Sequence, residues 1–277
     1  MVATTHKRAG EAGMAASDHG VSIERRDRIA IIRLDGPTPG NLLSQAAMTA
    51  LLEAARGLST DPYLAAVVLT GRADLFTLGF NLADGDRMGA LPLAERREAL
   101  SVGPRLCAAF EALEPLTIMA VEGWCVGGGV AIAGGFDLRV AGAGARFYVP
   151  EIERGMNMSW GSLPRLVNLM GPARTKRLVM LAEKLDAAKA AEWGLVDELA
   201  PAGGALDRAL EFAARAATMP PVQLRMCKAG INAYANALAP VAAALDRDQY
   251  LLAQASADYA EGVASFREKR EPQYRGE

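Results

Sequence analysis

The sequence predicts an α/β protein, in which a core of alternating strands and helices is followed by a C-terminal helical region. Short apolar, β-branched runs alternate with longer segments of helical periodicity, and the order strand, strand, helix recurs about every 40 to 50 residues. The 277-residue chain is 51% hydrophobic, which suits a large buried core. From Ala205 onward the patterns are helical, with breaks at Pro220-Pro221 and Pro240.

The first half of the chain contains clear strand and helix signals. Residues 21–24 and 29–34 flank a charged turn and predict a β-hairpin. The turn-forming residues 35–40 follow, and either Asn41 or Ser44 can cap a helix that runs to about Arg56. A buried strand is predicted at residues 64–70, a long helix at 93–113 and a second buried strand at 116–121.

The second half continues the same pattern. A short apolar helix follows the glycines at residues 127–129, and residues 137–140 and 146–149 are predicted strands, the second ended by Pro150. From Pro164 the chain is expected to be helical until Gly194, and residues 195–199 to form a short exposed strand.

Three parts are expected along the chain: a disordered leader at residues 1–20, an α/β core at 21–203 and a helical region at 204–277. The leader has no apolar stretch typical of a signal peptide or an anchor, and no segment reaches the ~18 apolar residues of a membrane helix. The net charge of −2 is spread along the chain, so we expect neither a nucleic-acid partner nor a membrane partner. The sequence predicts a soluble, cytoplasmic protein.

The two histidines, His6 and His19, both lie in the expected leader. This position argues against Ser-His-Asp and Cys-His catalysis and against a histidine-containing zinc site. The cysteines, Cys107, Cys125 and Cys227, are too few and too far apart for a disulfide framework or a thiolate metal site. No metal and no separate cofactor are expected.

Gly127, Gly128 and Gly129 separate a buried strand from an apolar helix. Glycines at such a junction allow a ligand to approach the backbone, and the first N–H groups of a helix have no partner within it. An oxygen that develops negative charge would be stabilised there. A tight turn packed under a neighbouring element would also explain the glycines.

A second glycine junction follows the strand at residues 64–70. Gly79 interrupts an apolar run and leaves the backbone of Phe80 free to present its N–H. If the N–H groups of Phe80 and Gly128 met, they would form a two-donor cradle for an enolate oxygen, of the kind that acyl chemistry requires. The sequence by itself does not bring the two groups together.

The two junctions resemble the paired signatures of the crotonase (enoyl-CoA hydratase/isomerase) superfamily. The resemblance rests first on residues 76–82, with Phe76, Gly79, Asn81 and Leu82 in place, and on residues 123–129. It continues through residues 147–151, 163–166 and 191–196 and closes at 261–272, so that it covers about residues 21–276. Single motifs of this kind are weak, whereas six in the same order and spacing are specific.

The resemblance implies a crotonase-like spiral of repeated ββα units with a C-terminal helical region, assembled as a homotrimer or a dimer of trimers. It implies an acyl-CoA thioester as substrate, with coenzyme A as part of that substrate, bound and converted in the core. The oxyanion hole maps onto Phe80 and Gly128. The substrate and CoA contacts map onto Pro39, Asn41, Phe76, Gly79, Asn81, Leu82, Gly127, Trp160, Phe266 and Lys269. Asn81 stands where the family usually has Asp.

The carboxylates decide which reaction the resemblance implies. Hydratases of the superfamily use two glutamates; the second matches Glu151, whereas the first falls on Ala131, which cannot exchange a proton. Isomerases that convert 3-enoyl-CoA into 2-enoyl-CoA keep one glutamate at the position of Glu151. The sequence therefore favours isomerisation with Glu151 as the base, and burial in an acyl pocket would raise its pKa.

Alternatives stay open at several residues. The family's usual Pro-Gly-x-Gly-Gly after Glu151 is altered at residues 158–162, and Trp160 and Met156 either add bulk near the acyl pocket or belong to the core. Ser159 matches the position of a nucleophilic aspartate in dehalogenases of the superfamily, but a serine without histidine favours a structural role. Structural or solvated roles are also favoured for Glu122, Asp137 and Glu153.

Other functions also stay open. One is an enoyl-CoA hydratase that acts on an unusual acyl group with a single glutamate. Another, of a different class, is an acyl-CoA-binding protein without turnover. A nucleotide-binding enzyme is disfavoured, because Ile132 stands where the dinucleotide fingerprint requires a small residue.

Overall fold

The apolar runs predicted as strands pair into a mainly parallel sheet in the computed structural model, which describes residues 15–16 and 19–277. Within these residues the large sheet has seven strands in the order β1-β2-β3-β4-β5-β7-β10, antiparallel through β3 and parallel from β3 onward. A small second sheet has the order β6-β8-β9. The strands are β1 (Ala15–Ala16), β2 (Val21–Arg26), β3 (Ile29–Leu34), β4 (Ala66–Thr70), β5 (Leu116–Val121), β6 (Trp124–Val126), β7 (Leu138–Gly142), β8 (Arg146–Tyr148), β9 (Leu185–Asp186) and β10 (Glu198–Ala200).

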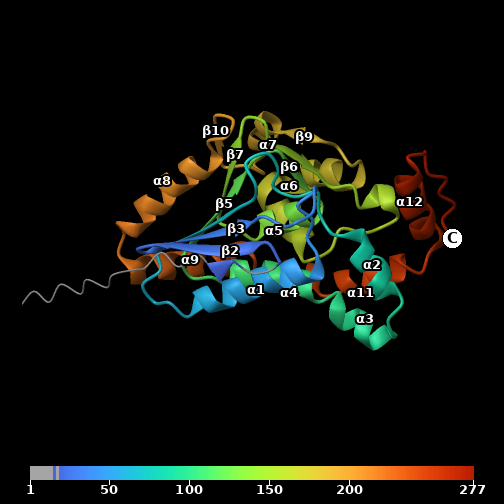
Figure 1. Cartoon of the computed structure of the whole chain (residues 1–277), viewed down its shortest axis with the longest axis horizontal. Helices are drawn as coiled ribbons and strands as arrows, with labels where there is room; N and C mark the ends of the chain where they lie inside the picture. Colours follow the sequence, from blue (N-terminus) through green and yellow to red (C-terminus); the bar gives the residue numbers. More distant parts are fainter. Residues whose placement is uncertain (1–14, 17–18) are drawn as a thin grey trace, which may run out of the picture.

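Helices cover both faces of the large sheet, with α8 on one face and α1 and α4 on the other (Figure 1). The helices are α1 (Gln45–Ser59), α2 (Leu82–Gly89), α3 (Leu93–Ala99), α4 (Val102–Glu111), α5 (Gly128–Gly134), α6 (Ser162–Met180), α7 (Ala187–Trp193), α8 (Ala205–Ala217), α9 (Pro221–Ala235), α10 (Ala239–Ala243), α11 (Asp246–Ala253) and α12 (Ala257–Glu268), with the 3-10 turn η1 (Ile152–Arg154) after β8.

The central strands are apolar on both sides because both faces of the sheet are covered. In β4, Val67 and Leu69 face the large core beneath α1 and α4, whereas Ala66 and Val68 face the smaller core under α8. Successive side chains of a strand point to opposite faces, so a strand between two layers needs a continuous apolar run. The prediction of buried strands is confirmed.

Successive turns of the chain add one strand to each sheet and then a helix. β5 enters the large sheet, β6 the small sheet, and α5 follows; β7, β8 and α6 repeat this order. The expected α/β spiral of ββα units is confirmed. The predicted hairpin is β2 and β3, and Ser44, not Asn41, caps α1 by accepting the Ala47 N–H at 3.1 Å.

The helix predicted at residues 93–113 is wrong as one element, since α3 ends at Ala99 and α4 begins at Val102. Pro104 lies in the first turn of α4, has no N–H for the carbonyl of Leu100 and is tolerated only near a helix start. A continuous helix across this position would lose a hydrogen bond and meet the proline ring. The break matters because both helices line the candidate site.

Other boundaries also differ from the prediction. The polar residues before Pro92 form α2, whose first turn is capped by Asn81 through a hydrogen bond from the Ala83 N–H. The strand expected at residues 195–199 begins later, as β10 (Glu198–Ala200), and the prediction of exposure is wrong for Leu195, which is fully buried after α7. β6 and β9 were not predicted, because two or three residues carry no periodic signal.

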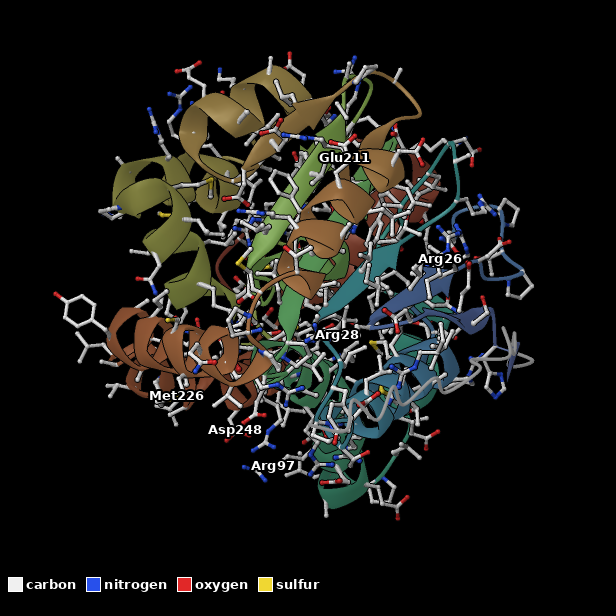
Figure 2. The ribbon with its side chains drawn as sticks, turned by 90° about the vertical axis from the view of Figure 1, so that its left-hand side faces the viewer. Arg26, Arg28, Arg97, Glu211, Met226 and Asp248 are labelled. Atoms are coloured by element: carbon white, nitrogen blue, oxygen red, sulfur yellow. The ribbon has the colours of Figure 1, made fainter. Side chains whose placement is uncertain are left out.

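The C-terminal region is helical as predicted, and it has two kinds of contact with the core. α8 packs on β4, β5 and β7, whereas α11 returns to the far end of the molecule beside α3. Arg97 of α3 and Asp248 of α11 pair at 2.9 Å in the lower part of Figure 2. Among the described residues, no helix is both long and apolar enough to cross a membrane.

Most of the expected leader, including His6, lies outside the described residues. His19 lies exposed in the turn before β2, and residues 15–16 pair with β2 as β1. His19 is therefore a surface residue of the described chain.

Asn41 is fully buried in the turn between β3 and α1, and its backbone has a φ of +47°. Its side-chain N–H groups donate to the carbonyls of Leu34 at 2.8 Å and Phe76 at 2.7 Å, and its Oδ1 accepts the Gly36 N–H at 2.7 Å. Asn tolerates positive φ better than most residues. Asn41 therefore ties the turn after β3 to the segment that leads to Gly79.

We expect Asn41→Ala to lower the free energy of unfolding by about 2–4 kcal/mol, because buried backbone groups lose their partners. Chemical denaturation monitored by circular dichroism measures the change. Gln223→Ala removes an exposed amide on α9 that has no hydrogen-bond partner among the described residues; it is the control and should change stability by less than about 0.5 kcal/mol. Equal stability of Asn41→Ala and the wild type would contradict this role.

Candidate active site

The two glycine junctions lie side by side in the structure. The Thr77 N–H donates to the Trp124 carbonyl at 2.9 Å, and the Val126 N–H donates to the Thr77 carbonyl at 3.0 Å. Gly79 has a φ of +94°, and a Cβ there would lie 2.9 Å from the Val126 carbonyl oxygen and 3.9 Å from the Gly128 nitrogen. This pairing brings the backbone of residues 79–80 against the start of α5.

The N–H groups of Phe80 and Gly128 are both available to a ligand. Among the described residues, neither group donates a hydrogen bond, whereas the neighbouring Asn81 and Gly127 N–H groups do. Gly128 is the first residue of α5, so its N–H has no partner in the helix and lies at the positive end of the helix dipole. Both residues line one pocket, as the two-donor prediction requires.

Glu151 reaches the same pocket from the other side. It follows Pro150 after β8, and its Oε1 lies 2.5 Å from the position that a Cβ on Gly127 would take. Gly127 has a φ of +52°, so both the backbone conformation and the approach of the carboxylate require glycine. The short strand pairing of β6 with β8 brings Gly127 and Glu151 together.

The Glu151 carboxylate is poorly solvated. Its Oε2 is buried and has no hydrogen-bond partner among the described residues. Burial raises the pKa of Glu151 to about 7, because the charged form loses its hydration; a backbone hydrogen bond and the charge of Arg154 act in the opposite direction. A carboxyl group with this pKa can act as a base near neutral pH.

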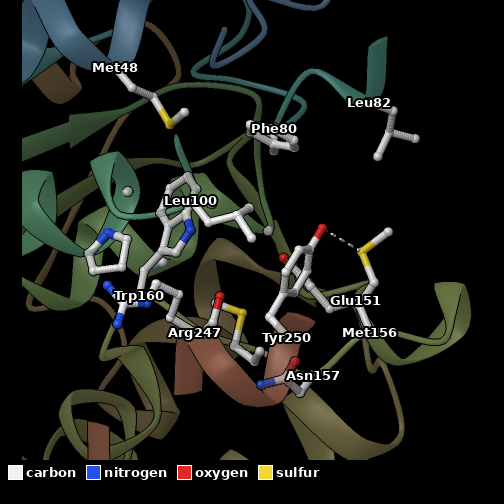
Figure 3. A pocket seen from close by; sticks show the side chains of 18 of the residues that line it. Met48, Phe80, Leu82, Leu100, Glu151, Met156, Asn157, Trp160, Arg247 and Tyr250 are labelled. Carbon is white, nitrogen blue, oxygen red and sulfur yellow. Dashed lines mark hydrogen bonds between the residues drawn. The ribbon is translucent and has the colours of Figure 1, made fainter. Parts of the chain in front are cut away.

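The pocket has an apolar wall and a small polar part (Figure 3). Its cavity volume is about 70 Å³, and it is partly open to solvent. Tyr250 extends into it from α11, with its hydroxyl 3.6 Å from the Met156 sulfur (Figure 3). The apolar wall comes mostly from α1 to α4 and from the segment after η1, and it includes Met48, Leu82, Met88, Leu100, Pro104, Met158 and Trp160.

Ala131 lines the pocket one turn after Gly128 on α5 and brings no polar group to it. Trp160 packs nearby, with its ring edge 2.7 Å from the position of a Cβ on Gly128. In the described chain, Glu151 is the one carboxylate among the residues that line this pocket. The site therefore offers a single carboxylate opposite two backbone donors.

The predicted binding residues fall into two groups. One group lines the pocket together with the predicted catalytic residues, and consists of Gly79, Leu82, Gly127 and Trp160 beside Phe80, Gly128 and Glu151. The other group lies outside the pocket lining, and consists of Pro39, Asn41, Phe76, Asn81, Phe266 and Lys269.

The structure gives several of the outer residues other contacts. The Phe76 side chain is fully buried in the core, and the Asn81 side chain caps α2. Phe266 is half-exposed on α12, with the Arg154 guanidinium 4.1 Å from its ring centre, and Lys269 ends that helix with a φ of +55°. The predicted CoA contacts of the outer group stay predictions; for Phe76 and Asn41 any contact would have to come through the backbone.

The other acidic candidates have structural partners. The Asp137 carboxylate accepts the Thr117 N–H at 2.8 Å and pairs with Lys228 at 2.7 Å, and Glu122 accepts the Ala205 N–H at 3.0 Å. Glu153 is exposed and accepts a hydrogen bond from the Tyr148 hydroxyl. No group of three metal-binding side chains occurs within residues 15–16 and 19–277.

Several pocket residues carried no signal in the sequence. Tyr250 and Arg247 come from α11, and Leu100 and Gly103 from the region where the predicted long helix breaks. Tyr250 and Glu151 are about 100 residues apart in the sequence and meet only through the packing of their elements. A local sequence pattern does not encode such a contact. The proline of α4 is the signal that could have identified the break.

A sequence model described as enoyl-CoA hydratase/isomerase matches residues 24–277. The chain is 29% identical over 257 residues to 2,3-dehydroadipyl-CoA hydratase of Escherichia coli K12, covering 92% of this chain and 98% of that protein. It is 32% identical over 256 residues to the probable enoyl-CoA hydratase echA8 of Mycobacterium tuberculosis, covering 92% and 97%.

Solved structures give the same fold. A crystal structure of an enoyl-CoA hydratase/isomerase from Pseudoalteromonas atlantica T6c superposes with a TM-score of 0.83 at 25% identity, covering 92% of this chain and 100% of that one. An enoyl-CoA hydratase from Mycobacterium avium subsp. paratuberculosis K-10 superposes with a TM-score of 0.82 at 25% identity, covering 92% and 98%. Both similarities extend over the core and the C-terminal helices.

The raised pKa of Glu151 predicts a pH-dependent stability. The folded protein holds the Glu151 proton up to about pH 7, whereas the unfolded chain releases it near pH 4.5. The protonated carboxyl group therefore contributes stability that is fully present below pH 4.5 and is lost as the pH rises through 7. We expect Glu151→Gln to gain stability relative to the wild type between pH 4.5 and 7, with a constant difference above. Denaturant unfolding from pH 4 to 9 measures this, with Glu153→Gln as the matched loss of one carboxylate. If the free energies of unfolding of the wild type and Glu151→Gln ran parallel from pH 4 to 9, the raised pKa of Glu151 would be contradicted.

Proposed function

The chain belongs to the enoyl-CoA hydratase/isomerase family and is an enzyme that acts on CoA thioesters, and we propose that it converts 3-enoyl-CoA into 2-enoyl-CoA with Glu151 as the proton carrier. The observation that carries this proposal is the pairing of one buried carboxylate with two free backbone N–H groups in one pocket. A double-bond shift needs one base, whereas hydration needs a second group to place and activate water.

The proposed reaction has two proton transfers. The thioester oxygen accepts hydrogen bonds from the N–H groups of Phe80 and Gly128, and Glu151 takes a proton from C2 of the substrate. The π electrons of the C3–C4 double bond and the electron pair left on C2 are then delocalised in an enolate that extends from C4 to the thioester oxygen. The two N–H donors stabilise the negative charge on that oxygen. The Glu151 carboxyl group returns the proton to C4, leaving the double bond between C2 and C3.

The environment of Glu151 supports this role. A base must be ionised to take the first proton and must hold it long enough to return it, and a pKa near 7 satisfies both conditions at neutral pH. The apolar wall around the carboxylate limits exchange with water. The fixed backbone donors stabilise charge on the enolate without rearranging, because main-chain hydrogen bonds at Gly79 and Gly127 hold the two segments in place.

Hydration of an enoyl-CoA with an unusual acyl group is the second candidate. Relatives that are 29% and 32% identical are named hydratases, and the Tyr250 hydroxyl brings another polar group to the pocket. Ala131 argues against it, because the position that carries the other hydratase glutamate has no proton to exchange. A binding protein without turnover is disfavoured by the intact pairing of Glu151 with the two donors.

Product analysis tests the proposal directly. We expect the wild type to convert 3-enoyl-CoA into 2-enoyl-CoA and Glu151→Gln to lower kcat by about 100- to 10,000-fold, the usual contribution of a general base. The residual activity of the variant should lose the rise through pH 7 that ionisation of Glu151 produces. Chromatography of both CoA products measures the outcome, with Glu153→Gln as the control.

Rapid formation of 3-hydroxyacyl-CoA from 2-enoyl-CoA, with no isomerisation, would replace this proposal by the hydratase. Tight binding of acyl-CoA with no product from either thioester would replace it by the binding protein. Full turnover by Glu151→Gln would remove Glu151 from any of these reactions.

Self-association as a homotrimer or a dimer of trimers is part of the proposal. Large apolar side chains on α9 to α11 are more than 60% exposed in the single chain, and Met226 points outward from α9 in Figure 2. They include Met226, Ile231, Tyr234, Val241 and Leu252. Large apolar side chains exposed on three successive helices favour an interface between subunits.

We expect a solution mass of three or six times that of the chain, measured by light scattering. Met226→Asp combined with Ile231→Asp should shift the protein to a smaller species, because two charges would be buried in the interface. Arg26→Asp on β2 is the control for a charge change elsewhere. A monomeric wild type at micromolar concentration would contradict the assembly.

A further inference from the structure

The Trp160 indole spans the gap between α4 and α5. Its Cε2 lies 2.1 Å from the position of a Cβ on Gly103, and its Cη2 lies 2.7 Å from that on Gly128. Real Cβ atoms do not approach other atoms so closely, so any residue other than glycine at position 103 or 128 would collide with the ring. One edge of the ring therefore contacts the helix of the proposed oxyanion hole, and the other contacts the opposite wall.

The turn that carries Trp160 is held by a network of buried groups. Trp160 and Gly161 have φ values of +63° and +66°. The Asp246 carboxylate accepts the Gly161 N–H at 2.5 Å, and the Arg165 guanidinium donates to the Trp160 carbonyl at 3.0 Å. Arg165 is itself held by Glu111 of α4 at 2.8 Å. The network connects the turn to α4 and α11 and holds the backbone from which the indole extends.

The position of the indole limits the space for the acyl group. A thioester oxygen at Phe80 and Gly128 places the first acyl carbons beside Glu151, and the ring edge at Gly128 lies next to them. Carbon atoms further along the acyl chain then meet the indole, which fills the space between Gly103 and Gly128. Close-packed side chains do not yield this space without loss of contacts.

We infer that Trp160 is a specificity-determining residue that restricts the enzyme to short acyl chains. The inference rests on the proposed function, because it places the thioester at Phe80 and Gly128. It concerns chain length alone and holds for isomerisation and for hydration. Without the indole, the gap between α4 and α5 becomes an apolar channel in which a longer acyl tail can lie.

A chain-length series tests the inference. The ratio of kcat/KM for the eight-carbon to the four-carbon 3-enoyl-CoA is measured for the wild type and for Trp160→Ala, and the same ratio is measured with the 2-enoyl substrates. We expect the ratio to rise by about 10-fold or more in Trp160→Ala, the effect of a few methylene groups gaining a pocket. Trp124→Ala, a partly exposed tryptophan on β6, is the matched control and should leave the ratio as it is in the wild type.

A second pair of variants tests the contact itself. Gly103→Ala forces a methyl group against the indole and should lower the melting temperature, whereas Gly103→Ala combined with Trp160→Ala should recover the temperature of Trp160→Ala alone. Equal losses in both backgrounds would mean that the ring does not fill the gap. Thermal unfolding also establishes that the variants used in the kinetic series are folded.

Binding separates failure of this inference from failure of the proposed function. Calorimetric titration with saturated butanoyl-CoA and octanoyl-CoA gives an affinity ratio without turnover, and we expect it to change in the same direction as the kinetic ratio. If the wild type converts no thioester but its affinity ratio shifts in Trp160→Ala, the function fails and the inference stands. If the wild type already prefers eight carbons to four, or if Trp160→Ala leaves both ratios unchanged, the inference is overturned.

Discussion

The site depends on the close approach of three backbone segments that glycine makes possible. Residues 77–80 pair with residues 124–126, and the latter pair with β8, which ends just before Glu151. Gly79 and Gly127 hold positive φ at the contacts, where a side chain would collide with a carbonyl or with the Glu151 carboxylate. The positions of the two N–H donors and of the base are therefore set by main-chain hydrogen bonds, and the surrounding side chains decide what reaches them.

The buried carboxylate connects stability with chemistry. Glu151 is placed where its charge is poorly solvated, and the resulting pKa near 7 makes ionisation of the folded protein less favourable than that of the unfolded chain. The same property suits a group that must both take and return a proton. A large, well-packed core between the sheet and its helices tolerates one such destabilising group.

The C-terminal helices belong to the active-site architecture as well as to the exterior. α8 closes one face of the sheet, and α11 brings Tyr250 into the pocket and Asp246 beneath the turn of Trp160. Arg97 and Asp248 connect α11 to α3. The acyl end of the pocket is thus built from segments about 150 residues apart, and its shape responds to changes in both.

The sequence by itself determined the α/β class, the family, the buried strands of the large sheet and the three central groups of the candidate site, because apolar periodicity, glycine junctions and Glu151 after Pro150 are local features. It missed the short elements β6, β9 and α2 and the division of residues 93–113 into α3 and α4. Tertiary structure alone decided whether the donors of Phe80 and Gly128 meet, how far burial raises the pKa of Glu151, and which side chains form the pocket wall. Asn41 illustrates the difference: its place in a turn was readable, and two of its buried hydrogen bonds are local, but the third depends on Phe76, 35 residues away. Such contacts arise from packing between distant segments, which no local pattern records.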